Sequence, residues 1–209
     1  QWVDIRTDVG ATVSTVYLYL EAMGIEPDAQ LATAIFYGIQ TDTRGLTRST
    51  SPIDQEVYIK MLPRLDREKL VKVESAGLPR EYFRTFVKGL QSAQVFGSVV
   101  VSYLGPMPRP DFTAEMADAL ARLENTQAAL CLGYHGDKMY LSLRTVPHLD
   151  AGALIREIIV PTGRAGGHGV MAGGRVLLAG QPPDALANEI IKRFLENVKD
   201  LGGPPETLL

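Results

Sequence analysis

Residues 163–174 are the segment that most limits how this chain can fold. Their sequence is GRAGGHGVMAGG, in which six of the twelve residues are glycine. Glycine loses more conformational freedom on folding than any other residue, so ordering six of them costs much free energy. We therefore expect a glycine-rich loop whose backbone takes positive φ values or has to lie very close to another group.

Cationic side chains accompany these glycines. Arg164 and His168 lie within the segment, and Arg175 follows it directly. Exposed N–H groups, an imidazole and guanidinium groups are together typical of a phosphate cradle. Residues 144–175 carry four arginines against two acidic residues, a net charge of +2, whereas the whole chain carries −3. This pattern predicts an anion-binding segment rather than a bulk binder of nucleic acid, with a ligand-free surface loop as the alternative.

The glycine spacing from Gly167 to Ala172 also matches that of dinucleotide-binding sites. Such a site requires a strand before the glycines and a helix after them. Here a helical pattern comes first and residues 175–180 have the composition of a short strand. Because the order is reversed, we reject a dinucleotide site.

The rest of the chain divides into a helical first part and a second part in which strands and helices alternate. Helices are expected near residues 12–24, 31–39 and 52–62, with Ser51 as the N-cap of the third. Residues 66–91 read as a charged helical connector, and strands are expected at residues 2–5, 99–104, 128–134 and 139–144. The pattern predicts an α/β fold, with a mixed sheet flanked by helices in the C-terminal part.

Composition excludes several classes of protein. No apolar run approaches the ~20 residues of a membrane-spanning helix, and the start of the chain does not resemble a signal peptide. The single cysteine, Cys131, lies in an apolar run, which is typical of a buried, unreactive thiol and of the reducing cytoplasm. Because the chain begins at Gln1 and enters an apolar run at once, we expect a fragment of a longer protein.

Three motifs taken together resemble the DHH phosphoesterases, a family named for an Asp-His-His triplet. Residues 8–12 (DVGAT) resemble the segment that follows the triplet and opens a helix. Residues 37–43 (YGIQTDT) resemble the fourth motif of the family, in which the aspartate between two threonines, here Asp42, is a metal ligand. The third motif resembles the GGHxxAAG signature of the DHH-associated C-terminal domain, and its residues here are Gly166, Gly167, His168, Ala172 and Gly173.

A further match and two departures accompany these motifs. Leu143 and Arg144 resemble the first two residues of the Leu-Arg-Ser that precedes the signature. The second alanine of the signature is shifted. The chain has no Asp-His-His triplet, and its histidines are His135, His148 and His168, of which we assign a role only to the last. The motifs that supply most metal ligands in the family are therefore missing from the chain.

The resemblance implies a hydrolase that cleaves phosphodiesters or phosphomonoesters at a two-metal centre, usually Mn²⁺. Asp42 would be one metal ligand. His168 would be the catalytic residue that stabilises charge on a phosphoryl oxygen, and it would bind the substrate together with Arg144, Gly166, Gly167, Ala172 and Gly173. The substrate would be a short single-stranded oligonucleotide or a nucleoside phosphate. Because one aspartate cannot hold two metal ions, we expect this chain alone to be inactive.

The resemblance also divides the chain. Residues 1–62 would be the end of the DHH catalytic domain, residues 63–92 a helical connector, residues 93–199 the DHH-associated substrate-binding domain and residues 200–209 a tail. The helical first part is short for burying its own core, so its apolar stripes should stay partly bare and favour a homodimer or larger oligomer.

Two functions from different classes remain open. The first is the C-terminal part of a phosphoesterase, similar either to oligoribonucleases and phosphoadenosine phosphate phosphatases or to RecJ exonucleases. The alternative is a non-catalytic nucleic-acid-binding module. The Asp42 motif favours the enzyme, because a pure binding module has no use for a metal ligand.

Overall fold

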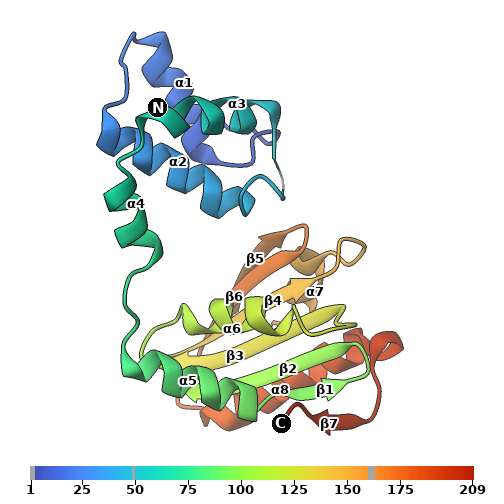
Figure 1. Cartoon of the computed structure of the whole chain (residues 1–209). Helices are drawn as coiled ribbons and strands as arrows, with labels where there is room; N and C mark the ends of the chain where they lie inside the picture. Colours follow the sequence, from blue (N-terminus) through green and yellow to red (C-terminus); the bar gives the residue numbers. More distant parts are fainter. Residues whose placement is uncertain (1–2, 49, 160–162) are drawn as a thin grey trace. The chain divides into compact units, whose positions relative to one another are not determined.

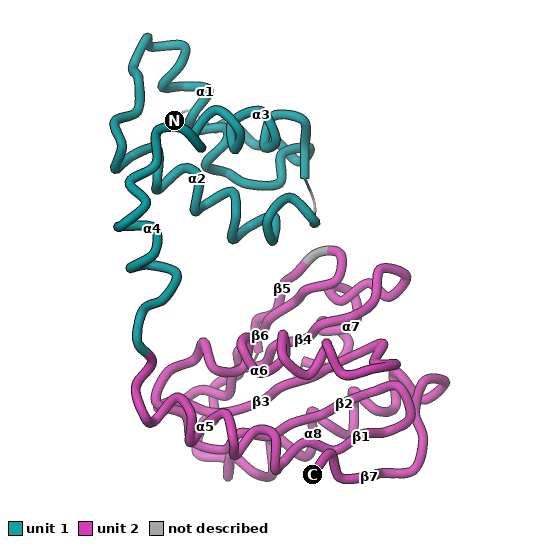
Figure 2. The backbone as a smooth tube through the Cα atoms, in the orientation of Figure 1, with its two compact units in different colours: residues 1–77 teal, residues 78–209 magenta. Residues whose placement is uncertain are grey.

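The computed structural model describes residues 3–48, 50–159 and 163–209. The chain forms two compact units, residues 1–77 and 78–209 (Figures 1 and 2). The first unit is helical, and the second is built around a seven-stranded mixed sheet. The predicted α/β fold is therefore confirmed. None of the helices in the described ranges is long and apolar enough to cross a membrane.

The first unit consists of helices that pack on one another. They are α1 (Thr12–Ala22), α2 (Ala29–Thr43), α3 (Pro52–Met61) and α4 (Arg67–Glu74), with a 3₁₀ turn, η1 (Leu62–Arg64). Their shared core includes Ile35, Phe36 and Ile39 of α2, and the Phe36 ring stacks on Tyr58 with 4.2 Å between centroids. The short strand expected at residues 2–5 is not found: residues 3–5 form no strand, and residue 2 lies outside the described part of the chain.

The apolar stripes of this unit are less bare than expected. Tyr17, Ile35 and Ile39 are buried, whereas Val16 and Leu31 keep 45% and 38% of their surface exposed. Helices α1, α2 and α3 bury their stripes against each other, since residues of all three share one core. The predicted homodimer stays a prediction.

A buried carboxylate joins the starts of α1 and α3. Asp54 accepts hydrogen bonds from the backbone N–H of Gly10 (2.9 Å), Ala11 (3.2 Å) and Ser51 (2.8 Å), and from the hydroxyls of Ser14 (2.6 Å) and Ser51 (2.7 Å). Ser51 caps α3 as predicted, because its hydroxyl accepts from the Asp54 N–H. Burial acts against the charged form of Asp54, but these donors together lower its pKa.

The second unit holds all the strands found in the described ranges. In chain order they are β1 (Gln94–Phe96), β2 (Val99–Pro106), β3 (Ala128–His135), β4 (Lys138–Thr145), β5 (Gly163–His168), β6 (Met171–Leu177) and β7 (Pro205–Thr207). Their order in the sheet is β5-β6-β4-β3-β2-β1-β7. Only the β2–β3 pair is parallel among these strands, and the turn between β3 and β4 falls at Gly136 and Asp137.

Helices cover both faces of the sheet (Figure 1). One face carries α5 (Arg80–Gln91) and α6 (Phe112–Leu120), and the other carries α7 (Ala151–Ile158) and α8 (Pro183–Asn197), which is followed by the 3₁₀ turn η2 (Lys199–Leu201). Side chains of β4 alternate accordingly: Leu141 and Leu143 join the α7–α8 core, and Ser142 bonds to Thr113 of α6.

Two segments differ from the sequence-based description. The stretch expected to be a helical connector does form helices, α4 and α5, but α5 packs Tyr82, Phe86 and Leu90 onto the sheet. Residues 200–209, expected to be a tail, include β7, which pairs with β1. A charged amphipathic helix that packs on a sheet can have the same amino-acid composition as a solvated linker. The polarity of the sequence alone therefore did not distinguish the two. The proposed domain limits stay a prediction.

Candidate functional site

The glycine-rich segment is a β-hairpin rather than the loop that we expected. β5 and β6 pair antiparallel, with Gly169 and Val170 between them, and Gly169 takes a φ of +55°. The pairing sets Gly166 opposite Gly173 and Gly167 opposite Ala172. Glycines give no alternation of polar and apolar side chains, which is why the strands were not recognised from the sequence.

On one face of the hairpin, the glycines permit close packing. A Cβ on Gly167 would lie 2.4 Å from the Ala172 Cα and the Met171 carbonyl oxygen, and a Cβ on Gly174 would lie 2.8 Å from the Ile159 side chain. A Cβ added to Gly152, in the first turn of α7, would lie 2.4 Å from the Gly167 carbonyl oxygen. These contacts fix the hairpin against α7.

This packing predicts a sharp difference between two neighbouring glycines. Gly167→Ala should lower the free energy of unfolding by about 1–3 kcal/mol, because the added methyl overlaps backbone that cannot move away. Gly166→Ala should change it by no more than about 0.5 kcal/mol, since nothing lies within 4 Å of its Cβ position. Chemical denaturation of both variants measures the difference, and equal losses would contradict the packing argument.

On the other face, the hairpin backbone is bare and surrounded by cations. Gly166 and Gly173 form the floor of a shallow cavity of about 310 Å³, lined also by Tyr140, Arg164 and Arg175. The two arginines occupy paired positions on adjacent strands, and both are exposed. Neither side chain has a hydrogen bond or ion pair with another described residue. Like charges at paired positions destabilise a hairpin, so this pair is suited to an anion that lies between them.

A second cavity of about 320 Å³ continues from the first. It is lined by Lys138 of β4, Arg164, Arg175 and the end of β6. The Lys138 ammonium lies 3.3 Å from a carboxylate oxygen of Asp137. Sequence reasoning missed Tyr140 and Lys138. Both are even-numbered residues of the strand that carries Arg144, so all three lie on the same face of that strand. This alternation is the signal that would have identified them.

Arg144 does not lie open in this cavity. Its Nε and Nη2 donate to the two carboxylate oxygens of Asp118 on α6, at 2.9 and 3.1 Å, and its Nη1 donates to the Leu143 carbonyl at 3.1 Å. Its side chain keeps only 12% of its surface exposed. The register nevertheless brings Arg144 near the signature, because Arg144 pairs with Met171, and Met171 with His168. The side chain of His168 lies outside the described part of the structure.

Asp42 lies in the last turn of α2, in the first unit. The hydroxyl of Thr41 donates to the Tyr37 carbonyl at 3.0 Å and that of Thr43 donates to the Ile39 carbonyl at 2.6 Å, so both threonines are directed back onto the helix. The Asp42 carboxylate is exposed and makes no hydrogen bond or ion pair with the residues that the structure describes.

The backbone just after Asp42 is strained. Arg44, Gly45 and Leu46 follow in the left-handed region, with φ values of 48°, 65° and 66°. Non-glycine residues adopt this region at a cost, and such strain is concentrated at functional sites. These left-handed residues end α2 directly after the helical turn that carries Asp42.

The described residues do not by themselves fit a metal pair. No three His, Cys, Asp or Glu side chains gather within the part of the chain that the structure describes. Cys131 offers neither a ligand nor a nucleophile, since burial raises the pKa of its thiol to about 12. This agrees with the predicted inert cysteine.

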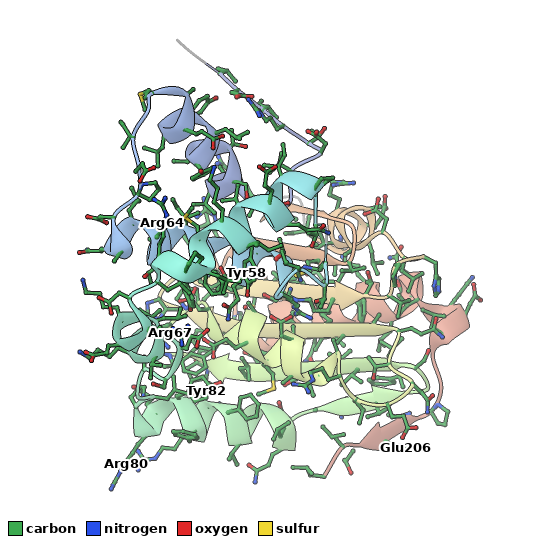
Figure 3. The ribbon with its side chains drawn as sticks, turned by 45° about the horizontal axis from the view of Figure 1, so that its top comes forward. Tyr58, Arg64, Arg67, Arg80, Tyr82 and Glu206 are labelled. Atoms are coloured by element: carbon green, nitrogen blue, oxygen red, sulfur yellow. The ribbon has the colours of Figure 1, made fainter. Side chains whose placement is uncertain are left out.

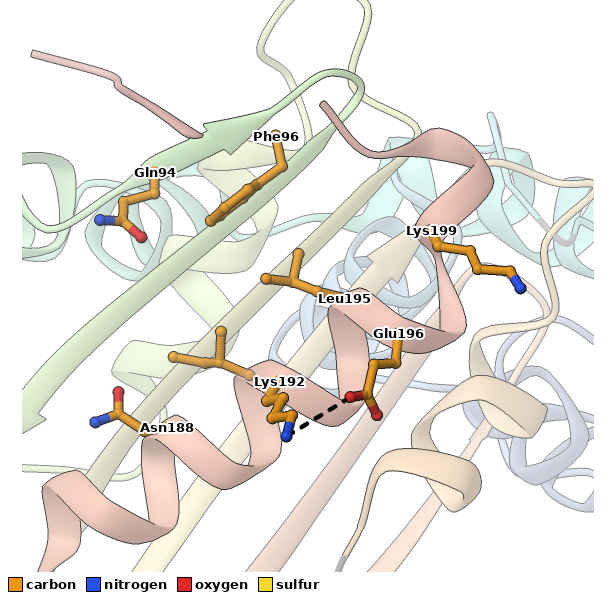
Figure 4. Close-up of a pocket in the computed structure, with 8 residues that line it drawn as sticks. Gln94, Phe96, Asn188, Lys192, Leu195, Glu196 and Lys199 are labelled. Atoms are coloured by element: carbon orange, nitrogen blue, oxygen red, sulfur yellow. Dashed lines mark ion pairs between the residues drawn. The ribbon is translucent and has the colours of Figure 1, made fainter. Parts of the chain in front are cut away.

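A separate groove of about 710 Å³ lies on the opposite side of the sheet, between β1 and α8. Its walls are largely apolar, with Phe96, Ile191 and Leu195, and its Lys192 pairs with Glu196 at 3.9 Å (Figure 4). Lys199 also lines the groove, but its walls offer mostly apolar side chains and no bare backbone, so it is less suited to a phosphate than the hairpin cavities.

Sequence comparison identifies the second unit. The DHHA1 domain matches residues 96–203, which is more than half of the chain and includes the hairpin. The chain belongs to the DHHA1 family. The resemblance to DHH phosphoesterases is thereby confirmed, and the oligoribonuclease-like or phosphatase-like subfamily stays a prediction.

Similar proteins are considerably longer than this DHHA1 chain. The uncharacterized protein MJ1633 of Methanocaldococcus jannaschii is 31% identical over 179 residues, which are 85% of this chain and 37% of that protein. An exopolyphosphatase-related protein from Bacteroides fragilis has a similar fold, with a TM-score of 0.72 and 18% identity over 93% of this chain and 58% of its own. RecJ of Thermus thermophilus, crystallised with Mg²⁺, shows a weaker similarity (TM-score 0.43, 14% identity, covering 92% and 29%). The chain thus spans less than two thirds of these relatives.

Proposed function

We propose that this DHHA1 chain is the substrate-holding part of a metal-dependent phosphoesterase that acts on short oligonucleotides or nucleoside phosphates. The observation that carries the proposal is the bare floor of Gly166 and Gly173, flanked by two arginines that have no partner among the described residues. Only a ligand that approaches backbone closely and carries negative charge exploits both features, and a phosphate does so.

The residues around the floor would divide the work of binding. Arg164 and Arg175 would contact phosphoryl oxygens directly, and the Tyr140 ring offers a flat surface against a base or sugar. Arg144, whose charge is paired with Asp118, would offer a remaining N–H at the edge of the site rather than a full bidentate contact. His168 would donate to a phosphoryl oxygen. Gly167 and Ala172 would contribute indirectly, because their close packing keeps the hairpin in position.

Catalysis in the whole protein would need a divalent metal, which we propose to be Mn²⁺. When bound, such a metal would activate a water and stabilise charge on the phosphoryl group. Asp42 is proposed as one of its oxygen ligands, on the basis of its exposed carboxylate at the strained end of α2. No cluster of metal-ligating side chains is present among the described residues. We therefore propose that this chain alone is inactive and that the remaining metal ligands belong to the rest of the protein.

Binding of a dinucleotide tests the substrate site. Arg164→Ala combined with Arg175→Ala should weaken binding of the RNA dinucleotide pApA at least about tenfold, because two charged hydrogen-bonding groups are lost. Isothermal titration calorimetry at low salt measures the affinity. Lys192→Ala with Lys199→Ala removes the same charge from the α8 side of the sheet and serves as the control. Equal affinities for the parent chain and the hairpin variant would exclude the site.

A further inference from the structure

Helix α5 carries a row of cations that the proposed substrate site does not use. Arg80, Arg84 and Lys88 follow one another at intervals of four residues, about 6 Å along the helix axis. They line a groove of about 740 Å³ together with Pro106, Met107 and Pro108, at the end of β2 and just beyond it. Figure 3 labels Arg80 at the outer end of this helix, with Tyr82 turned towards the body of the unit.

The charges of this groove are not balanced within the unit. All three cations are exposed, and none of their side chains has a hydrogen bond or ion pair with another residue that the structure describes. Glu81 is the acidic residue that lines the groove, so its net charge is positive. Like charges four residues apart destabilise a helix. A bound polyanion would remove this repulsion.

The sheet is modified where the groove meets it. The β2–β3 pairing shifts register between Tyr103 and Pro106, and Gly105 takes a φ of +67° within the bulge. The Lys88 ammonium lies over the strand here, 2.7 Å from the place that a Gly105 Cβ would occupy. Bulges are frequent next to functional sites, where they redirect side chains.

This groove lies at the same end of the sheet as the hairpin cavities. The Met107 carbonyl lies 2.9 Å from His135 Nδ1, and His135 pairs with Lys138, which lines the second hairpin cavity. From β5 through β6, β4 and β3 to β2 there are four strand spacings, about 19 Å. A stacked single strand, at about 3.4 Å per nucleotide, covers that distance with about six nucleotides.

We propose that the α5 groove is a second phosphate-binding surface, which holds the part of a single-stranded oligonucleotide that extends beyond the hairpin. The inference rests on the proposed function and names its substrate class: strands of about six nucleotides rather than dinucleotides alone. Arg80, Arg84 and Lys88 contact phosphates as charges and read no base, so the surface selects length and not sequence.

Two ligands and three variants separate this surface from the hairpin site. The variant Arg80→Gln/Arg84→Gln/Lys88→Gln should bind a hexanucleotide at least about tenfold more weakly than the parent chain and lower the slope of log K against log[salt] by about 2, as expected for three lost phosphate contacts. Its affinity for pApA should stay unchanged. The hairpin variant should lose both ligands. The matched control Lys192→Gln/Arg193→Gln/Lys199→Gln removes three cations from α8 and the turn after it, and should lose neither.

Fluorescence anisotropy with labelled hexanucleotides of two unrelated sequences provides the affinities, and circular dichroism verifies that each variant is folded. Unchanged hexanucleotide binding in the α5 variant would overturn the inference, as would a loss that depends on sequence. If the α5 variant keeps its affinity for the hexanucleotide but loses binding to vesicles containing phosphatidylserine, the inference is also overturned, in favour of a membrane-binding surface. If pApA fails to bind the parent chain while the hexanucleotide binds through α5, the hairpin proposal fails and the α5 surface stands.

Discussion

Asp54→Ala should lower the free energy of unfolding of the first unit by about 3–5 kcal/mol, a loss typical of broken buried hydrogen-bond networks. The substitution leaves five hydrogen-bond donors without their acceptor, three of them backbone N–H groups at the starts of α1 and α3. Because Asp54 has no exposed surface, water cannot replace the carboxylate without opening the unit. Amide hydrogen exchange of α2 core residues such as Ile35 measures the loss within this unit alone.

A capping aspartate on the same unit provides the control. Asp66 accepts one backbone hydrogen bond, from Lys69 N–H at 3.0 Å, so Asp66→Ala should cost about 1 kcal/mol. Acid provides an independent measurement. Since the pKa of Asp54 is lowered from its ordinary value of 3.8, its contribution is complete above that pH and is lost as the pH falls through the lower folded value. The alanine variant should lack this loss, and an identical acid profile would contradict the role of Asp54.

Asp42→Asn in the whole protein should reduce Mn²⁺-dependent hydrolysis of a short oligonucleotide by about three orders of magnitude or more. Asp42 is the ligand proposed above, and because the residues of a two-metal centre act as a unit, losing one charged ligand would remove most of the rate. The fold should be unaffected, because the exposed carboxylate holds no described neighbour. Initial rates at saturating Mn²⁺ measure the effect.

The other end of the same helix supplies the matched control. Asp28 caps α2 by accepting from the Leu31 N–H at 2.8 Å, so Asp28→Asn should keep full activity. Full activity in Asp42→Asn would remove the aspartate from the metal site and leave the nucleic-acid-binding module as the better description. The present chain, tested alone under the same conditions, should show no turnover that depends on Asp42.

Local signals in the sequence predicted most of the elements. Ser51 and Pro52 open α3, and the turn at Gly136 and Asp137 joins β3 to β4, because caps and turns are set by nearby residues. The hairpin was missed, since Gly166 and Gly173 carry no side chain that could show which face of a strand they occupy.

The contacts that determine which residues are available for a ligand are not local. Arg144 was expected to be open to a phosphate, but Asp118, which lies 26 residues earlier, reaches it from α6. Ser14, near the start of α1, donates its hydroxyl to Asp54, 40 residues later. No periodicity in the sequence encodes such pairings. They follow from which helix covers which part of the sheet, and this is decided by the packing of the whole unit.

The position of β7 affects how this domain should be isolated. The family match ends at residue 203, whereas β7 pairs with β1 over residues 205–207, and the Leu208 N–H donates to the Ala93 carbonyl at 3.1 Å. A protein cut at the family limits would also start after α5, which covers the face around Leu104 and Met116. It would expose a strand edge and an apolar face, both of which promote aggregation. Residues 78–209 are therefore the better unit to express, crystallise and titrate.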